Sequence, residues 1–99
     1  MQLELILDEP KVSPNLDLLR GKFKHTGTEY PTCFKSFHNE IFEYGKVKVV
    51  FHWQPIHGDY AEVFENGKNV WTIYDLLVTS NEELAKQIID SCQSLHRLR

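Results

Sequence analysis

The stretch YAEVFENGKNVWTIY, residues 60–74, decides the fold of this 99-residue chain. Two runs rich in β-branched and aromatic residues, Tyr60–Glu65 and Lys68–Tyr74, flank the pair Asn66-Gly67. An Asn-Gly pair between two such runs is the strongest short-range signal of a β-hairpin, because both turn positions need a positive φ. We therefore predict two antiparallel strands joined by a two-residue turn.

The turn also predicts which residues face each other across the hairpin. A two-residue connection places Glu65 opposite Lys68 and Val63 opposite Val70, an opposite-charge pair and a β-branched pair. In this register one face of the hairpin carries Tyr60, Glu62, Phe64, Asn69, Trp71 and Ile73. Both faces are then substantially apolar, so each needs either a covering layer within the domain or a binding partner.

The segments on either side of the hairpin extend the sheet and add a helix. Upstream, apolar residues alternate with polar ones from Val47 to Trp53, which predicts a half-buried strand. Downstream, Ser80 followed by Glu83 forms a capping box at the start of a helix. The helix then presents one apolar stripe, formed by Leu84, Ile88, Cys92 and Leu95.

The N-terminal half of the sequence predicts its secondary structure less clearly. Apolar residues between 32 and 45 recur at helical spacing and favour a helix, although their β-branched and aromatic types make a strand the alternative. We also predict a strand at Leu3–Leu7, a short helix at Pro14–Arg20, and a weak strand or loop at Lys22–Tyr30. The expected fold is a single α+β domain over residues 1–99. It is an antiparallel β-meander packed against a C-terminal α-helix, with one or two further helices N-terminal to the meander.

Composition narrows the functional classes. Hydrophobic residues make up 41% and charged residues 25% of the chain, as in ordinary globular domains. The net charge of −3 lacks the basic excess of a protein that binds phosphates, which disfavours nucleic acid as a partner. The start of the chain has no signal-peptide pattern and no run long enough to span a membrane. We therefore expect a cytoplasmic protein that keeps Cys33 and Cys92 reduced and uses no membrane.

The leading functional hypothesis is a small protein–protein binding module of the inhibitor, antitoxin, immunity or regulatory-subunit type. No catalytic motif joins the polar residues, so a non-enzyme is favoured, with no catalytic residues and no cofactor. Aromatic side chains are enriched at the energetic centres of interfaces. The partner would be another protein or a second copy of the chain. The predicted binding residues are Trp53, Asp59, Tyr60, Glu62, Trp71 and Tyr74.

Two alternatives stay open. The first is a small metal-dependent hydrolase that uses His52, His57 and Asp59, which offer two imidazoles and a carboxylate within eight residues. His38 with Glu40 is a weaker pair of the same kind. The second is a nucleic-acid binder that uses the basic stretch from Arg20 to His25, where an aromatic ring could stack on a base.

Overall fold

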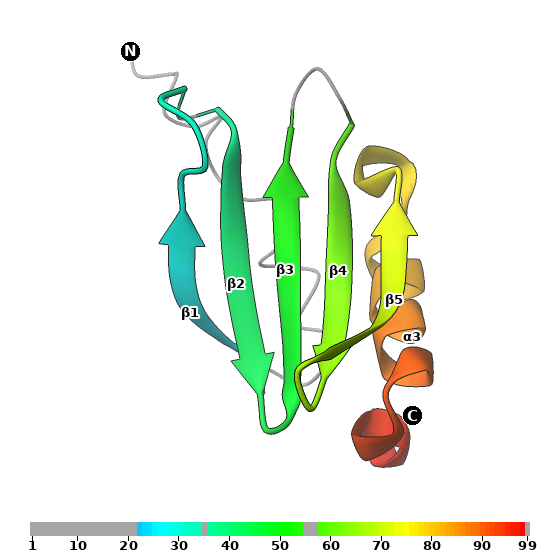
Figure 1. The fold of residues 1–99 in the computed structure, drawn as a ribbon. Helices are drawn as coiled ribbons and strands as arrows, with labels where there is room; N and C mark the ends of the chain where they lie inside the picture. The colour runs from blue at the N-terminus through cyan, green and yellow to red at the C-terminus, as the bar shows by residue number, and fades with distance from the viewer. Residues whose placement is uncertain (1–21, 35, 55–57, 99) are drawn as a thin grey trace.

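The structure, a computed structural model, describes residues 22–34, 36–54 and 58–98. The described residues form an α+β unit in which one antiparallel sheet is followed by one α-helix (Figure 1). The sheet is a meander whose spatial order is the chain order, β1-β2-β3-β4-β5. Its strands are β1 Lys24–Glu29, β2 His38–Tyr44, β3 Val47–Trp53, β4 Tyr60–Glu65 and β5 Lys68–Tyr74. The later elements are the 3-10 turn η1 Leu76–Val78, the helix α3 Asn81–Ser91 and the 3-10 helix η2 Gln93–Leu98.

The C-terminal helix lies where the sequence predicts it. Ser80 is its N-cap, and the Ser80 hydroxyl accepts a hydrogen bond of 3.0 Å from the backbone N–H of Glu83. The helix ends at Ser91 rather than continuing to the end of the chain, and η2 follows it. No helix among the described residues is both long and apolar enough to cross a membrane.

The core lies between α3 with η2 and one face of the sheet, called here the helix-side face. Figure 1 shows α3 along β5, at one side of the sheet. The predicted apolar stripe is buried as expected, and each of its leucine and isoleucine side chains contributes about 1.5–3 kcal/mol when it leaves water. The largest fully buried side chains are Phe51, Ile73, Leu84, Ile88, Leu95, Val47, Val49, Val63 and Cys92. The opposite face of the sheet is called the far face below.

The predicted hairpin is correct, but part of its register is wrong. Glu65 pairs with Lys68 as expected, whereas Val63 pairs with Trp71 and not with Val70. The reason is a β-bulge, in which the ladder shifts between Val63 and Phe64 so that β5 carries one extra residue. The side-chain amide of Asn69 donates to the carbonyl oxygens of Val63, at 3.3 Å, and of Trp71, at 3.1 Å, and so bridges the bulge.

The bulge corrects the predicted faces of the hairpin. Tyr60 pairs with Tyr74 and Glu62 with Thr72, so these four side chains share the far face. Trp71 and Ile73 pair instead with Val63 and Ala61 on the helix-side face, and Ile73 belongs to the buried core. The predicted grouping of Trp71 and Ile73 with Tyr60 is therefore wrong.

The helix favoured for residues 32–45 is also wrong, and the alternative, a strand, is correct over His38–Tyr44. Each of these seven residues pairs with a residue of β3, and β1 pairs along the other edge. The turn between β2 and β3 is short because Gly45 adopts a positive φ of 60°. Strand pairing on both edges outweighs the helical spacing, in agreement with the β-forming residue types. The expected strand at Leu3–Leu7 and helix at Pro14–Arg20 lie outside the described residues.

Candidate functional site

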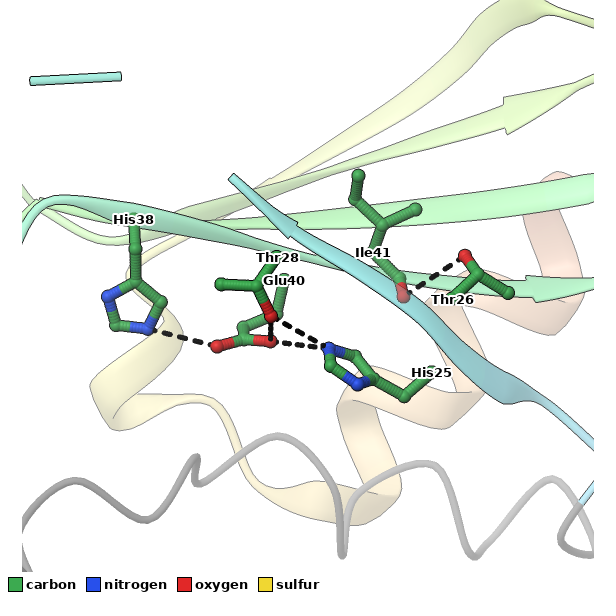
Figure 2. Close-up of polar contacts among 6 residues, drawn as sticks. All are labelled: His25, Thr26, Thr28, His38, Glu40 and Ile41. Carbon is green, nitrogen blue, oxygen red and sulfur yellow. Dashed lines mark hydrogen bonds and ion pairs between the residues drawn. The ribbon is translucent and has the colours of Figure 1, made fainter. Parts of the chain in front are cut away.

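Glu40 on β2 is the one buried charged side chain among the described residues, with an exposed fraction of 8%. Its oxygen Oε1 lies 2.5 Å from Nε2 of His25 and accepts a hydrogen bond of 2.9 Å from the hydroxyl of Thr28. Its other oxygen, Oε2, lies 3.2 Å from Nε2 of His38. Figure 2 shows the carboxylate between the two imidazoles. A buried carboxylate needs partners of this kind, because burial of an unpaired charge is very costly.

Strand pairing brings this cluster together. In the β1–β2 register Thr28 pairs with Glu40 and His25 pairs with Phe42, so both β1 side chains share the face of the carboxylate. His38 lies two residues before Glu40 on β2 and therefore on the same face. The sequence analysis noted His38 with Glu40 but missed His25 and Thr28, because the favoured helix over 32–45 left β1 without a pairing strand.

The chemistry of the cluster is that of a structural anchor. The Nδ1 atom of His38 is buried without a hydrogen-bond partner among the described residues, so we assign the ring proton to Nε2, which faces Glu40. Both imidazoles thus contact the carboxylate, and the contacts from His25 and Thr28 fasten the edge strand β1 to β2. Nowhere in the described part of the chain do three His, Cys, Asp or Glu residues form a group that could hold a metal ion.

His52 of the predicted metal site lies on the far face with both ring nitrogens engaged. Its Nδ1 lies 2.9 Å from Oδ1 of Asn39, and its Nε2 lies 2.8 Å from Oε1 of Glu62. Both ring nitrogens are therefore in contact with oxygen atoms of the chain itself. Asp59 accepts a hydrogen bond of 2.7 Å from the backbone N–H of Gln54 and so closes the connection between β3 and β4. His57 lies outside the described residues.

The six predicted binding residues divide among three places. Tyr60, Glu62 and Tyr74 gather on the far face, where the ring of Tyr60 stacks 4.4 Å from His52 and 6.1 Å from Tyr74. Burial, together with Glu62 and Tyr74, raises the pKa of the Tyr60 phenol. Asp59 lies in the β3–β4 connection described above. The remaining two, Trp53 and Trp71, lie on the helix-side face.

These two tryptophans differ in exposure and in their contacts. Trp53 is partly buried and stacks 6.5 Å from Phe51. Trp71 is 49% exposed, and its indole N–H donates a hydrogen bond of 2.8 Å to Gln87 of α3. Trp71 is therefore fixed in place while much of its ring remains available for contact.

Exposed large hydrophobic side chains concentrate at β5 and η1. Four of the six among the described residues are Trp71, Tyr74, Leu77 and Val78, with exposed fractions of 49%, 67%, 67% and 84%. We call these four the β5–η1 surface. The sequence analysis identified Trp71 and Tyr74 but missed the other two. The available signal was the apolar run from 76 to 78 between the hairpin and the helix cap, of which only Leu76 is buried.

The predicted basic patch is partly used within the chain. Phe23 packs against Tyr44, with ring centroids 5.5 Å apart, and its side chain lies against the core. His25 contacts Glu40 as described above. Lys22 and Lys24 are exposed, and Arg20 and Gly21 lie outside the described residues.

No protein-family model, curated protein or solved structure matches this chain. The functional conclusion therefore comes from the residues of the chain itself.

Proposed function

We propose that this chain is a small protein-binding module whose β5 edge takes an extended segment of a protein partner as an additional strand. One observation carries the proposal: exposed aromatic side chains project on both sides of an edge strand. Trp71 lies on the helix-side face and Tyr74 on the far face, and the apolar surface continues into Leu77 and Val78 of η1.

The backbone of β5 supports strand addition. Among the described residues β5 pairs with β4 alone, so its outer edge carries backbone donors and acceptors that a further strand can use. In strand addition the backbone hydrogen bonds supply affinity, while side chains on the two faces supply specificity. An added strand would contact Trp71 on one side and Tyr74 on the other.

Both aromatic side chains are held before a partner arrives. Trp71 is hydrogen-bonded to Gln87, and Tyr74 packs against Tyr60. Binding to fixed side chains loses less conformational entropy than binding to mobile ones. Tryptophan and tyrosine also dominate the residues whose truncation weakens protein interfaces most.

Apolar contact and backbone pairing, rather than charge, carry the proposed binding. The carboxylates Asp59, Glu62 and Glu65 are already engaged within the chain. Each of these carboxylates accepts or faces a hydrogen bond within the chain: from Gln54, from His52, and from Gln93 with Ser94, respectively. The inhibitor, antitoxin, immunity or regulatory-subunit role and the cytoplasmic location remain predictions from the sequence.

Photocrosslinking tests the proposal. A photoreactive residue replaces Leu77 in one variant and Phe34 in a matched control, because the two side chains are equally exposed, at 67% and 66%. Phe34 lies in the connection between β1 and β2, the two strands at the opposite edge of the sheet from β5. The proposal expects a defined protein adduct at Leu77 that purified components reproduce and that Tyr74→Ser weakens. Equal adducts at both positions, or none at Leu77, would contradict it.

A further inference from the structure

We infer that the strand added to β5 is β5 of a second copy of the chain, in a two-fold symmetric dimer with one sheet continuous across both copies. This inference rests on the proposed function and names the partner. It follows from the self-complementary order of side chains along Lys68–Tyr74. In a two-fold interface the same residues of each copy form both sides, so β5 must be able to pair with an antiparallel copy of itself.

The bulge fixes how a strand can face β5. Because β5 has one extra residue at Val70 and Trp71, β4 places a single residue opposite these two. A strand on the outer edge of β5 must do the same. An antiparallel pairing centred on Thr72 repeats the β4 register on the other side. Thr72 then faces Thr72 of the second copy, a type of pair that stabilises antiparallel sheets.

The remaining pairs in this register are compatible with one another. Trp71 pairs with Ile73 of the other copy on the helix-side face, where Ile73 is already buried in its own core and adds no exposed surface. Asn69 faces Tyr74 on the far face. Beyond them, the Lys68 ammonium comes beside the Asp75 carboxylate where β5 ends, and two-fold symmetry makes every one of these pairs occur twice.

The alternation of side chains excludes a pairing that is shifted by one residue. A shift by one residue would set Trp71, on the helix-side face, against a far-face residue, because successive side chains point to opposite faces. With Thr72 at the centre, the two Trp71 side chains become diagonal neighbours on one face, within the reach of aromatic rings. The exposed part of Trp71 is then covered by its symmetry mate.

The other edge of the sheet lacks these properties. The strand β1 has the sequence KHTGTE, which offers no large apolar side chain. A glycine lies in its middle, and its ladder to β2 is irregular between His25 and Gly27. The bulge does not distinguish the two edges, because β5 carries one as well. The exposed aromatic side chains do distinguish them, so self-association uses β5 and not β1.

A disulfide tests the geometry directly. Thr72→Cys is made in a Cys33→Ser background, while the native Cys92 is buried. Across an antiparallel ladder, directly opposed Cα atoms lie about 4.5–5.5 Å apart, which suits a disulfide. Thr26→Cys in the same background is the matched control, a threonine on the other edge strand. We expect the Thr72→Cys variant to form a covalent dimer under mild oxidation far faster than the control.

A charge variant tests the register without a new cysteine. Lys68→Glu places a carboxylate beside Asp75 of the other copy at two symmetric positions, and we expect the dimer dissociation constant to rise about tenfold. Adding Asp75→Asn removes the repulsion and should restore most of the affinity. Asparagine also tolerates the left-handed φ of 57° at this position. Sedimentation equilibrium measures the dissociation constant, with the 11.6 kDa chain as monomer.

The outcomes separate this inference from the proposed function. A chain that stays monomeric at tens of micromolar, with Thr72→Cys crosslinking no faster than Thr26→Cys, overturns the second-copy inference. If a different protein still crosslinks at Leu77, the proposed function stands with another partner. If neither happens, both fall. Should the cysteine variant fail to fold by circular dichroism, the sedimentation of the native chain and of Lys68→Glu decides.

Discussion

The indole N–H of Trp71 donates a 2.8 Å hydrogen bond to Oε1 of Gln87, which ties the edge strand β5 to the helix α3. Gln87 in turn donates through Nε2 to Glu83, at 3.2 Å, and the Glu83 backbone N–H is held by the helix cap Ser80. A half-exposed tryptophan is thus connected to the start of the helix. The tryptophan of the β5–η1 surface is therefore positioned by the helix α3.

Replacing Gln87 with alanine should weaken the β5–η1 surface without unfolding the chain. Loss of one hydrogen bond to a half-exposed indole should lower the free energy of unfolding by about 0.5–1.5 kcal/mol. Because Trp71 then loses its fixed orientation, partner or dimer affinity should fall further than stability does. Urea denaturation and sedimentation measure the two effects. The control is Lys86→Ala, an exposed residue of the same helix, and equal losses of affinity in both variants would refute the role of Gln87.

Glu40→Gln should destabilise the chain while keeping its shape. The amide offers a single acceptor oxygen, and its NH2 group confronts donors from His25, Thr28 or His38. Hydrogen bonds to charged groups contribute about 1.5–3 kcal/mol, so the free energy of unfolding should fall by about that amount. Chemical denaturation at neutral pH gives the value, and amide exchange should quicken in β1. Glu43→Gln, on the exposed side of the same strand, should change stability by less than about 0.5 kcal/mol.

Glu65 makes the free energy of unfolding depend on pH. Hydrogen bonding by Ser94, together with the backbone amide of Gln93, holds the pKa of the Glu65 carboxyl below its usual value. Because the folded pKa is lowered, this contribution is present above the ordinary carboxyl range and is lost as pH falls through the folded pKa. Glu65→Gln should therefore cost about 1 kcal/mol at neutral pH, as for a lost helix cap, and progressively less in acid. Stability measured against pH checks this, and a constant difference at all pH values would contradict it.

The two cysteines should differ sharply in reactivity. Cys33 is exposed, whereas Cys92 is buried and its burial raises the thiol pKa, which disfavours the reactive thiolate. An alkylating reagent should modify Cys33 in the folded chain and Cys92 only after denaturation. Mass spectrometry of the alkylated chain reads this out, with Cys33→Ser as the control. Rapid modification of Cys92 in the native chain would show that its place between α3 and the sheet is wrong.

Local signals in the sequence predicted the hairpin and the C-terminal helix, whereas long-range pairing decided the strand at His38–Tyr44 and the register. The Asn66-Gly67 turn and the Ser80 cap each depend on only a few neighbouring residues, so both could be predicted from the sequence. The bulge at Val63 was not, because it depends on how two strands fit together, and it moved Trp71 to the other face. The part of the Glu40 cluster that comes from β1 was missed for the same reason, since His25 lies fifteen residues away and meets Glu40 only through the β1–β2 pairing.

The outer edge of β5 is where the chain is proposed to bind a second copy, and backbone amide exchange measured strand by strand tests this most directly. In the isolated monomer, half of the β5 amides point away from β4 and should exchange as fast as those on the outer edge of β1. We predict that raising the protein concentration protects these outward β5 amides and leaves β1 unchanged. Exchange in β5 that stays fast and independent of concentration, up to the highest concentration measured, would contradict strand pairing between copies.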